Sequence, residues 1–159
     1  MLQFDLRGNL KPHKPIQCGL KDLKRHFVDE IESDSRLDNY KKYLRYSNNL
    51  KTLLGNRKLK QWLNGSFVTK KRNPKDIDLV TFIDNNTIEL FGDRLNTFRG
   101  VEGWEVYKVD AYIIPVHSPQ SKLVNFTELD TTEWLYLFGH TKLNRKGQVF
   151  GKGFLEIFY

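Results

Sequence analysis

The sequence predicts one α/β or α+β domain, in which a small mixed β-sheet is flanked by helices. Residues 20–32 and 37–54 place apolar side chains at the spacing of amphipathic helices. Residues 76–83 and 104–115 are rich in β-branched and aromatic side chains, which favours strands. The chain has 159 residues, the usual length of one domain, and its sequence shows neither an internal repeat nor a low-complexity linker.

The other elements are predicted from the same patterns and from turn residues. The first 16 residues carry Pro12 and Pro15 and are expected to form an extended arm or loop. In chain order, we then expect a helix stop at Gly55, a strand at 59–63, a basic loop at 69–75, a turn at 84–86, a helix at 87–98, a turn bracketed by Gly100 and Gly103, a helix from Thr131 or Thr132 to Gly139, a basic loop at 140–148 and a strand at 149–158.

Composition indicates a folded protein of a reducing compartment. Hydrophobic residues make up 39% of the chain, enough for a core, and the single Cys18 excludes an internal disulfide. The first residues lack the pattern of a signal peptide, and no apolar run approaches the roughly 20 residues of a membrane span. We therefore expect a soluble, cytoplasmic protein without a membrane partner.

The net charge of +7 is unevenly distributed. Residues 39–75 contain no acidic side chain, and their basic residues are Lys41, Lys42, Arg45, Lys51, Arg57, Lys58, Lys60, Lys70, Lys71, Arg72 and Lys75. Such a segment attracts polyanions, so it could bind RNA or phosphates. A solvated helix surface has the same composition, and the pattern alone leaves both interpretations open.

Three aspartates and a Gly-Ser pair carry the functional signal. Asp76 and Asp78 lie two residues apart in a predicted strand, so both carboxylates are expected on one face of it. Two like charges so close favour a bound cation, and Mg²⁺ prefers such oxygen ligands. Asp110 lies in the next predicted strand; if the two strands pair, three carboxylates converge and could hold two metal ions.

A phosphate site is predicted beside these carboxylates. Gly65 permits close approach of a phosphate to the backbone, and Ser66 adds a hydroxyl and an amide. Lys70, Lys71 and Arg72 follow shortly after and could neutralise phosphates or hold the acceptor. A second basic loop with Lys142, Arg145 and Lys146 could fold over the same ligand.

Together these residues resemble the nucleotidyltransferase superfamily, which includes DNA polymerase β, tRNA terminal transferases, antibiotic adenylyltransferases and the small minimal bacterial enzymes. The resemblance lies in Gly65-Ser66, in Asp76-Ile77-Asp78-Leu79 and in the later Asp110. It covers residues 59–114, about a third of the chain. The two ends are similar to an uncharacterised small bacterial nucleotidyltransferase-like family.

The resemblance implies a fold, a site and a reaction. It implies a nucleotidyltransferase-like domain with an N-terminal arm and helices (1–55), a catalytic core (56–115) and a C-terminal helix and strand (116–159). Asp76, Asp78 and Asp110 would hold Mg²⁺, or Mn²⁺ in its place, and Ser66 would contact the terminal phosphates. Asp110 would bind the catalytic metal and help activate the acceptor hydroxyl.

The expected reaction moves a nucleoside monophosphate from a nucleoside triphosphate, such as ATP, to an acceptor hydroxyl, with release of pyrophosphate. The sequence leaves the acceptor open between an RNA end, a protein hydroxyl, a small molecule and a second nucleotide. Two alternatives remain: a catalytically inactive member of the fold that binds a partner protein in a regulatory or antitoxin-like role, and an RNA-binding module that uses residues 39–75.

Overall fold

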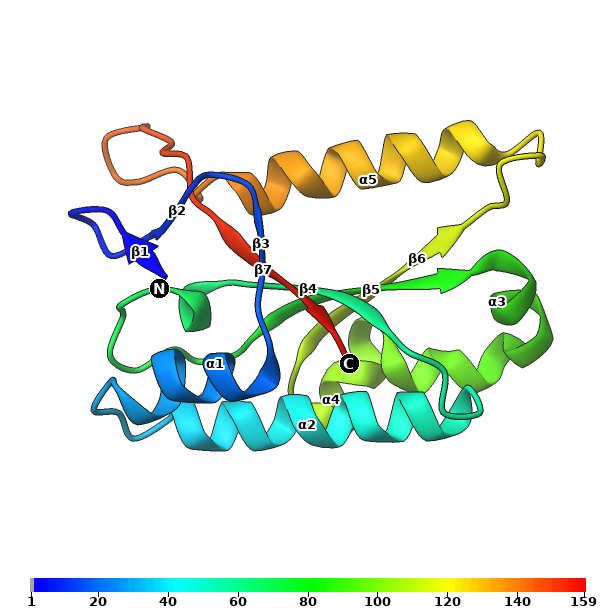
Figure 1. The fold of residues 1–159 in the computed structure, drawn as a ribbon, viewed down its shortest axis with the longest axis horizontal. Helices are drawn as coiled ribbons and strands as arrows, with labels where there is room; N and C mark the ends of the chain where they lie inside the picture. The colour runs from blue at the N-terminus through cyan, green and yellow to red at the C-terminus, as the bar shows by residue number, and fades with distance from the viewer. Residues whose placement is uncertain (1) are drawn as a thin grey trace.

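A computed structural model describes residues 2–159 as a central sheet with helices on both faces (Figure 1). The five-stranded sheet has the order β3 (Pro15–Gln17), β7 (Phe154–Phe158), β4 (Lys60–Asn64), β5 (Asp78–Asp84) and β6 (Asp110–Val116). Strand β4 is antiparallel to both of its neighbours, whereas β5 is parallel to β6 and β3 is parallel to β7. The predicted α+β class, a small mixed sheet flanked by helices, is confirmed.

The N-terminal arm is more ordered than expected. Strands β1 (Gln3–Phe4) and β2 (Leu10–Lys11) form a separate antiparallel pair, and β3 joins the edge of the main sheet. The main sheet therefore takes strands from both ends of the chain as well as from residues 56–115. Such pairing depends on partners more than 130 residues away, which the local pattern of the first 16 residues does not reveal.

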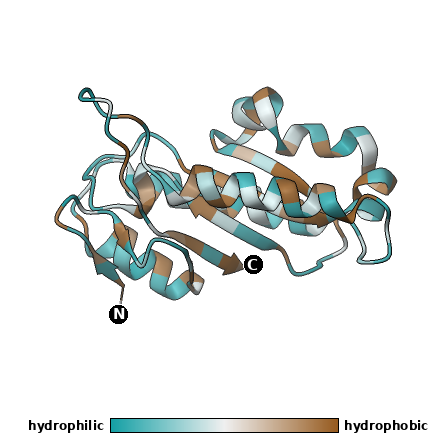
Figure 2. Ribbon diagram, turned by 90° about the horizontal axis from the view of Figure 1, so that it is seen from above, coloured by the Kyte–Doolittle hydropathy of each residue, from teal (hydrophilic) through white to brown (hydrophobic). Residues whose placement is uncertain are grey.

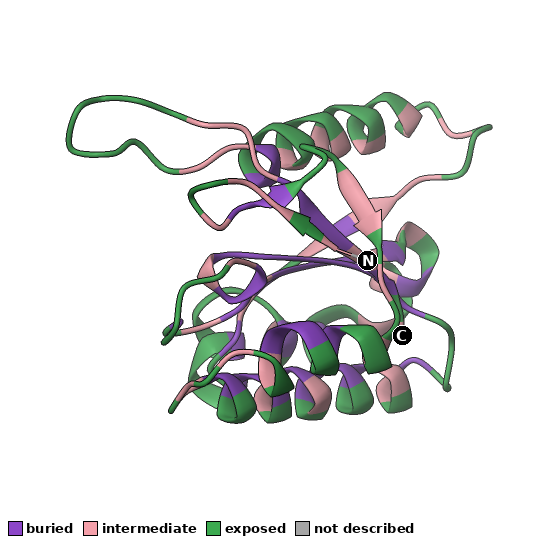
Figure 3. Cartoon of the chain, turned by 60° about the vertical axis from the view of Figure 1, so that its left-hand side comes forward, coloured by how far each residue is buried: buried purple, intermediate pink, exposed green. Residues whose placement is uncertain are grey.

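Two helical segments cover one face of the sheet as predicted. Helix α1 (Leu20–Lys24) continues directly into the π-helical segment η1 (Arg25–Asp29), and α2 (Arg36–Leu53) follows. Their buried side chains meet alternate residues of the strands, for example Leu63, Leu79 and Leu155, in the main hydrophobic core. In Figure 3 the sheet is largely buried, and the outward surfaces of the helices are exposed.

The segment between β5 and β6 is more helical than predicted. Asp84 ends β5, and its carboxylate accepts a hydrogen bond from the Thr87 amide (3.0 Å), so residues 84–86 start helix α3 (Asn85–Phe91) rather than form a turn. The 3₁₀ segment η3 (Gly92–Phe98) follows and completes the helical stretch expected at 87–98.

The expected turn at Gly100 and Gly103 and the expected strand from Trp104 are wrong. Residues Gly100–Tyr107 form helix α4, which ends at Lys108 in a left-handed conformation. Gly103 permits this path, because a Cβ there would lie 3.0 Å from the Phe98 carbonyl carbon. The strand β6 then begins at Asp110, which is its first residue and not its middle.

Helix α5 (Val124–Gly139) covers the opposite face of the sheet and begins earlier than predicted. Thr131 and Thr132, expected to cap it, lie inside it, and the Thr132 hydroxyl donates instead to the Glu128 carbonyl (2.8 Å). A smaller cluster, which includes Trp62, Val80 and Phe138, lies between α5 and the sheet. Figure 2 looks onto α5 and shows apolar residues scattered among polar ones along it. The last strand, β7, occupies only the second half of the range predicted for it.

Candidate functional site

Strand register brings Asn64, Asp78 and Asp110 side by side. Asn64 lies opposite Asp78 in the antiparallel pair β4–β5, and Asp78 lies opposite Asp110 in the parallel pair β5–β6. Side chains alternate between the faces of a sheet, and these three share the face of Trp62, Val80 and Ile114, which is covered by α5. The strand that carries Asp110 pairs with the strand that carries Asp78, which is the condition on which convergence of their carboxylates depended.

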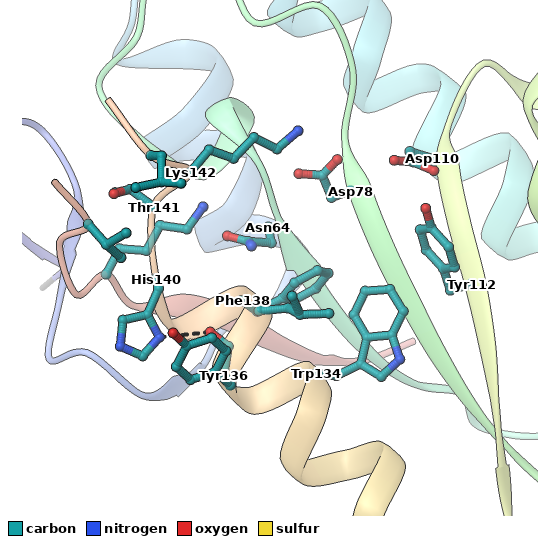
Figure 4. A pocket seen from close by; sticks show the side chains of 14 residues that line it. Asn64, Asp78, Asp110, Tyr112, Trp134, Tyr136, Phe138, His140, Thr141 and Lys142 are labelled. Carbon is teal, nitrogen blue, oxygen red and sulfur yellow. Dashed lines mark hydrogen bonds between the residues drawn. The ribbon is translucent and has the colours of Figure 1, made fainter. Parts of the chain in front are cut away.

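A cavity of about 380 Å³ opens over these strand ends, between the sheet and the C-terminal end of α5 (Figure 4). Its sheet side carries Asn64, Asp78, Asp110, Tyr112 and Lys152, and its helix and loop side carries Trp134, Tyr136, Leu137, Phe138, His140, Thr141, Lys142, Leu143 and Val149. The cavity thus combines carboxylates, ammonium groups and aromatic rings. Tyr112 and Trp134 meet across it with ring centroids 4.6 Å apart.

Gly65 packs directly against Asp78. Its φ is +81°, a conformation that favours glycine, and a Cβ on it would lie 2.6 Å from Asp78 Oδ2. Residue 65 therefore has to be glycine for the Asp78 carboxylate to keep its position. Ser66 begins the short segment η2 (Ser66–Val68) next to the cavity and is not among its lining residues. Three residues of 3₁₀ helix are too short to provide the helix N-terminus that was expected to bind phosphate.

Asp76 lies outside the strand, so its expected place on one strand face with Asp78 is wrong. Strand β4 ends opposite Asp78, and the sheet therefore offers Asp76 no antiparallel partner. Asp76 borders a second cavity of about 400 Å³, which it shares with Gly100, Val101, Trp104, Asp110 and Tyr112. Asp110 and Tyr112 line both cavities and form the wall between them.

The three carboxylates affect one another even though they face two cavities. Burial raises the pKa of Asp78, and the negative charges of Asp76 and Asp110 raise it further. The positive charges of Lys152 and Lys142 act in the opposite direction on the same pKa. Burial and then the charge of Asp110 raise the pKa of Tyr112. The site is therefore a concentration of negative charge faced by two lysines.

The basic residues expected near the phosphates, Lys70, Lys71 and Arg72, line neither cavity. The Lys70 ammonium lies 4.4 Å from the ring centre of Phe4, and Arg72 pairs with Glu32 (3.2 Å). Lys71 is exposed. Their loop is held away by Arg36, a fully buried side chain that donates hydrogen bonds to the carbonyls of Phe27, Phe67, Thr69, Lys71 and Arg72.

Lys142 and Lys152 line the first cavity instead. Lys142 belongs to the predicted basic loop, whereas Arg145 and Lys146 of that loop do not line the cavity. Sequence reasoning assigned no role to Lys152. The signal available for it was the position of Lys152 two residues before an apolar strand, which puts it on the same face as Phe154.

The donor set fits Mg²⁺ shared with a phosphate better than a metal site built from protein alone. Within residues 2–159 no group of three His, Cys, Asp or Glu side chains is arranged to hold a metal ion. Asp78 and Asp110 are nevertheless adjacent on paired strands. Beside them, the buried Oδ1 of Asn64 has no hydrogen-bond partner among residues 2–159. Mg²⁺ in nucleotide sites commonly takes one or two carboxylates and completes its shell with phosphates and water.

The basic residues of segment 39–75 are spread over several elements of the fold. Its members lie on α2, on the connection to β4, on β4 itself and on the loop before β5. Several have acidic partners, such as Lys42 with Asp38 (2.6 Å) and Lys60 with Glu156 (3.2 Å). Across residues 2–159 no helix is both long and apolar enough to cross a membrane.

Comparison with known proteins places the chain in a family. The model of a family of unknown function, DUF6932, matches residues 2–158. The chain belongs to this family. Neither the curated proteins nor the solved structures contain a match. The match includes both cavities and the N-terminal arm of this DUF6932 chain, so the family pattern spans the whole fold described above.

Proposed function

We propose that this protein is a Mg²⁺-dependent nucleotidyltransferase that moves a nucleoside monophosphate from a nucleoside triphosphate to an acceptor hydroxyl. The observation that carries the proposal is the register of Asp78 with Asp110 at the mouth of a cavity, beside a Gly-Ser turn packed on Asp78. Three parts of the resembled pattern, distant in sequence, thus lie together: Gly65-Ser66, Asp78 and Asp110.

The first cavity suits the nucleotide. Its aromatic lining, from Tyr112, Trp134 and Tyr136, offers flat surfaces for a base, while its carboxylates and lysines lie at the strand ends. Asp78 and Asp110 would hold Mg²⁺ together with the phosphates. When bound, the ion would neutralise charge on the phosphates and lower the pKa of an oxygen that it binds. The free Oδ1 of Asn64 is an acceptor for a sugar hydroxyl, a base amino group or a metal-bound water.

The second cavity suits the acceptor, because Asp110 lines both. An acceptor hydroxyl there would attack the α-phosphorus as its proton passes to the Asp110 carboxylate. A bond forms between the acceptor oxygen and the α-phosphorus, the bond from the α-phosphorus to the bridging oxygen breaks, and pyrophosphate leaves with that electron pair. Trp104, which is 39% exposed, gives this cavity an aromatic wall.

Asp76 would then act from the acceptor side rather than as a partner of Asp78 on one strand face. Its charge raises the pKa of Asp78, so the two groups are electrostatically coupled. We propose that the negative charge of Asp76 contributes to metal affinity, because it adds to the negative potential that attracts a cation to Asp78. The protein would be cytoplasmic, where triphosphates and Mg²⁺ are available.

Calorimetry separates this proposal from an inactive binding protein of the same fold. The protein is titrated with each of the four ribonucleoside triphosphates, with Mg²⁺ and with EDTA. The proposal expects one or more triphosphates to bind only with Mg²⁺, and binding to fall at least about tenfold in Asp78→Asn, since charge-assisted contacts contribute about 1.5–3 kcal/mol. Asp93→Asn, an exposed aspartate outside both cavities, is the matched control. Equal binding with and without Mg²⁺, or unchanged binding by Asp78→Asn, contradicts the proposal.

The acceptor is found by incubating the protein with each α-labelled triphosphate, Mg²⁺ and total cell lysate, and identifying the molecule that becomes labelled. A labelled RNA, protein or small molecule would each name the acceptor class. Binding of lysate RNA without label transfer would favour the alternative of an RNA-binding module.

A further inference from the structure

The strongest unassigned feature of the site is Lys152. It lines the first cavity from the sheet side, immediately before β7, and faces the same region as Asp78. Burial lowers the pKa of the Lys152 ammonium, the negative charge of Asp78 raises it, and the charge of Lys142 lowers it. These couplings indicate that the two lysines and Asp78 share one electrostatic environment.

The backbone of Lys152 is fixed from two sides. Its amide donates to the Gly139 carbonyl at the end of α5 (2.8 Å), and the next amide, of Gly153, donates to the Leu10 carbonyl of β2 (2.7 Å). Isolated bridges join His140 to Gly151 and Leu10 to Gly153. Lys152 is therefore held between the C-terminal end of α5 and the N-terminal arm.

Both flanking glycines lie close to the N-terminal arm, and Gly153 is required there because its neighbour is backbone, whereas the neighbour of Gly151 is the exposed side chain of His13. A Cβ on Gly151 would lie 2.5 Å from His13 Nδ1, and a Cβ on Gly153 would overlap the Pro12 carbonyl oxygen. The arm thus presses directly against both neighbours of Lys152. Lys152 is therefore the residue of this short segment whose side chain lines the cavity, and the residues on either side of it are glycines.

Neither ammonium group is neutralised by the protein. Over residues 2–159, Lys142 and Lys152 take part in no ion pair, no side-chain hydrogen bond and no contact with an aromatic face. Other lysines of the chain do find such partners, as Lys24 does with Asp29 (2.6 Å) and Lys60 does with Glu156. Lys152 is half-buried and Lys142 is exposed, and an ammonium group that lines a cavity without such a partner is suited to an anionic ligand.

We propose that Lys152, together with Lys142, binds the β- and γ-phosphates of the triphosphate and the pyrophosphate formed from them. This assignment rests on the proposed function for its place in a reaction, and it replaces Lys70, Lys71 and Arg72 as the phosphate-binding cations. Both lysines line the cavity from the segment that joins α5 to β7: Lys142 lies in the loop directly after α5 (Figure 4), and Lys152 lies two residues before β7.

Inorganic pyrophosphate is the direct probe, because it carries neither base nor sugar. Its affinity is measured by calorimetry in the presence of Mg²⁺ for the wild-type protein, Lys152→Gln, Lys152→Arg and Lys142→Gln. We expect affinity to fall about tenfold to a hundredfold in either glutamine variant, and Lys152→Arg to retain much of it, because the charge is kept. Lys41→Gln, which removes an exposed charge on α2, is the matched control.

The thermal unfolding midpoint of each variant shows whether it folds. If Lys152→Gln does not fold, Lys142→Gln still tests the assignment, because it removes the other cation. Wild-type protein that does not bind pyrophosphate, or glutamine variants that bind it as tightly as Lys41→Gln, would overturn the assignment. Pyrophosphate binding that depends on Lys152 without any nucleotide transfer would contradict the proposed reaction and leave the anion site standing. If nucleotide transfer survives both glutamine changes with an unchanged KM for the triphosphate, the anion site is contradicted and the proposed reaction stands.

Discussion

At the scale of single residues, Gly65 and Asp78 are the most tightly linked pair in the site. The positive φ of Gly65 and the 2.6 Å approach of a Cβ to Asp78 Oδ2 mean that residue 65 acts both on the backbone and on a functional carboxylate. These two effects can be separated, because Gly55 also has a positive φ (+72°) and has open space around it.

We predict that Gly65→Ala costs about 1–3 kcal/mol of unfolding free energy, because φ +81° with ψ −169° is a conformation that essentially only glycine adopts, and that it also abolishes Mg²⁺-dependent nucleotide binding. Gly55→Ala should show a similar loss of stability and bind nucleotide normally. Urea unfolding and calorimetry measure the two properties. Normal nucleotide binding by Gly65→Ala would mean that the turn does not position Asp78.

Asp78 should also destabilise the metal-free protein. Its folded pKa is raised by burial and by Asp76 and Asp110, so folding penalises the charged form. The penalty is complete above the folded pKa and disappears as the pH falls through the folded pKa towards the unfolded one.

In EDTA we therefore predict that Asp78→Asn has a higher unfolding midpoint than wild type at pH 7, and that the gap closes as the pH falls towards 4. Thermal unfolding across this pH range makes the measurement, with Asp93→Asn as the control. A destabilised Asp78→Asn at pH 7 would show that the carboxylate serves the fold rather than a ligand.

At the scale of elements, the two faces of the sheet are unequally covered. Helices α1, α2 and α4 contribute to a large core on one face of the sheet, which includes Leu23 and Ile157, while α5 packs on a small cluster that includes Trp62 and Phe138. Several large apolar side chains of α5 remain exposed, including Phe126 (55%) and Leu129 (63%). The helix that forms one wall of the nucleotide cavity is thus the less firmly attached one.

We predict that amides of α5 exchange hydrogen faster than those of α2, because exchange reports the free energy of local opening. Hydrogen exchange followed by mass spectrometry measures this directly. Addition of Mg²⁺ and a triphosphate should slow exchange in α5 and in residues 140–152, and leave α2 unchanged. Equal protection of α5 and α2 in the free protein would contradict this account of the two cores.

Sequence patterns predicted the elements whose signals are local. Helix α2, strand β4 and most of β5 follow from apolar spacing, whereas the pairing of the Asp78 strand with the Asp110 strand was only a condition that the structure fulfils. Helix α4 was mistaken for a strand because a short apolar run from Trp104 fits both, and the deciding feature is the packing of Gly103 on Phe98. The position of Asp76 was wrong because the end of β4, not the alternation along β5, decides where the sheet stops.

The cations proposed to bind the phosphates were not predictable from the sequence for a similar reason. Lys70, Lys71 and Arg72 are close to Gly65-Ser66 in sequence, but buried Arg36 binds the carbonyls of their loop and so fixes its path. Lys152 is 74 residues from Asp78 in sequence and reaches the cavity through the packing of the N-terminal arm on Gly151 and Gly153.

At the scale of the whole molecule, the site is assembled from all parts of the chain. The central strands supply Asn64, Asp78 and Asp110, helix α5 supplies aromatic walls, and the C-terminal segment supplies Lys152 under the N-terminal arm. The chain as a whole has a net charge of +7, whereas its site concentrates carboxylates; in the proposed function the first would attract a triphosphate from a distance and the second would bind Mg²⁺.

The central claim is that the Asp78–Asp110 pair catalyses nucleotidyl transfer, and the most direct measurement is incorporation of α-labelled phosphate from a triphosphate into lysate in the presence of Mg²⁺. The account predicts incorporation with wild-type protein and with Asp93→Asn, none in EDTA, and a loss of at least about a hundredfold in Asp110→Asn, since a general base contributes about 10²–10⁴-fold. Incorporation by Asp110→Asn at the wild-type rate, with the variant folded, would contradict it.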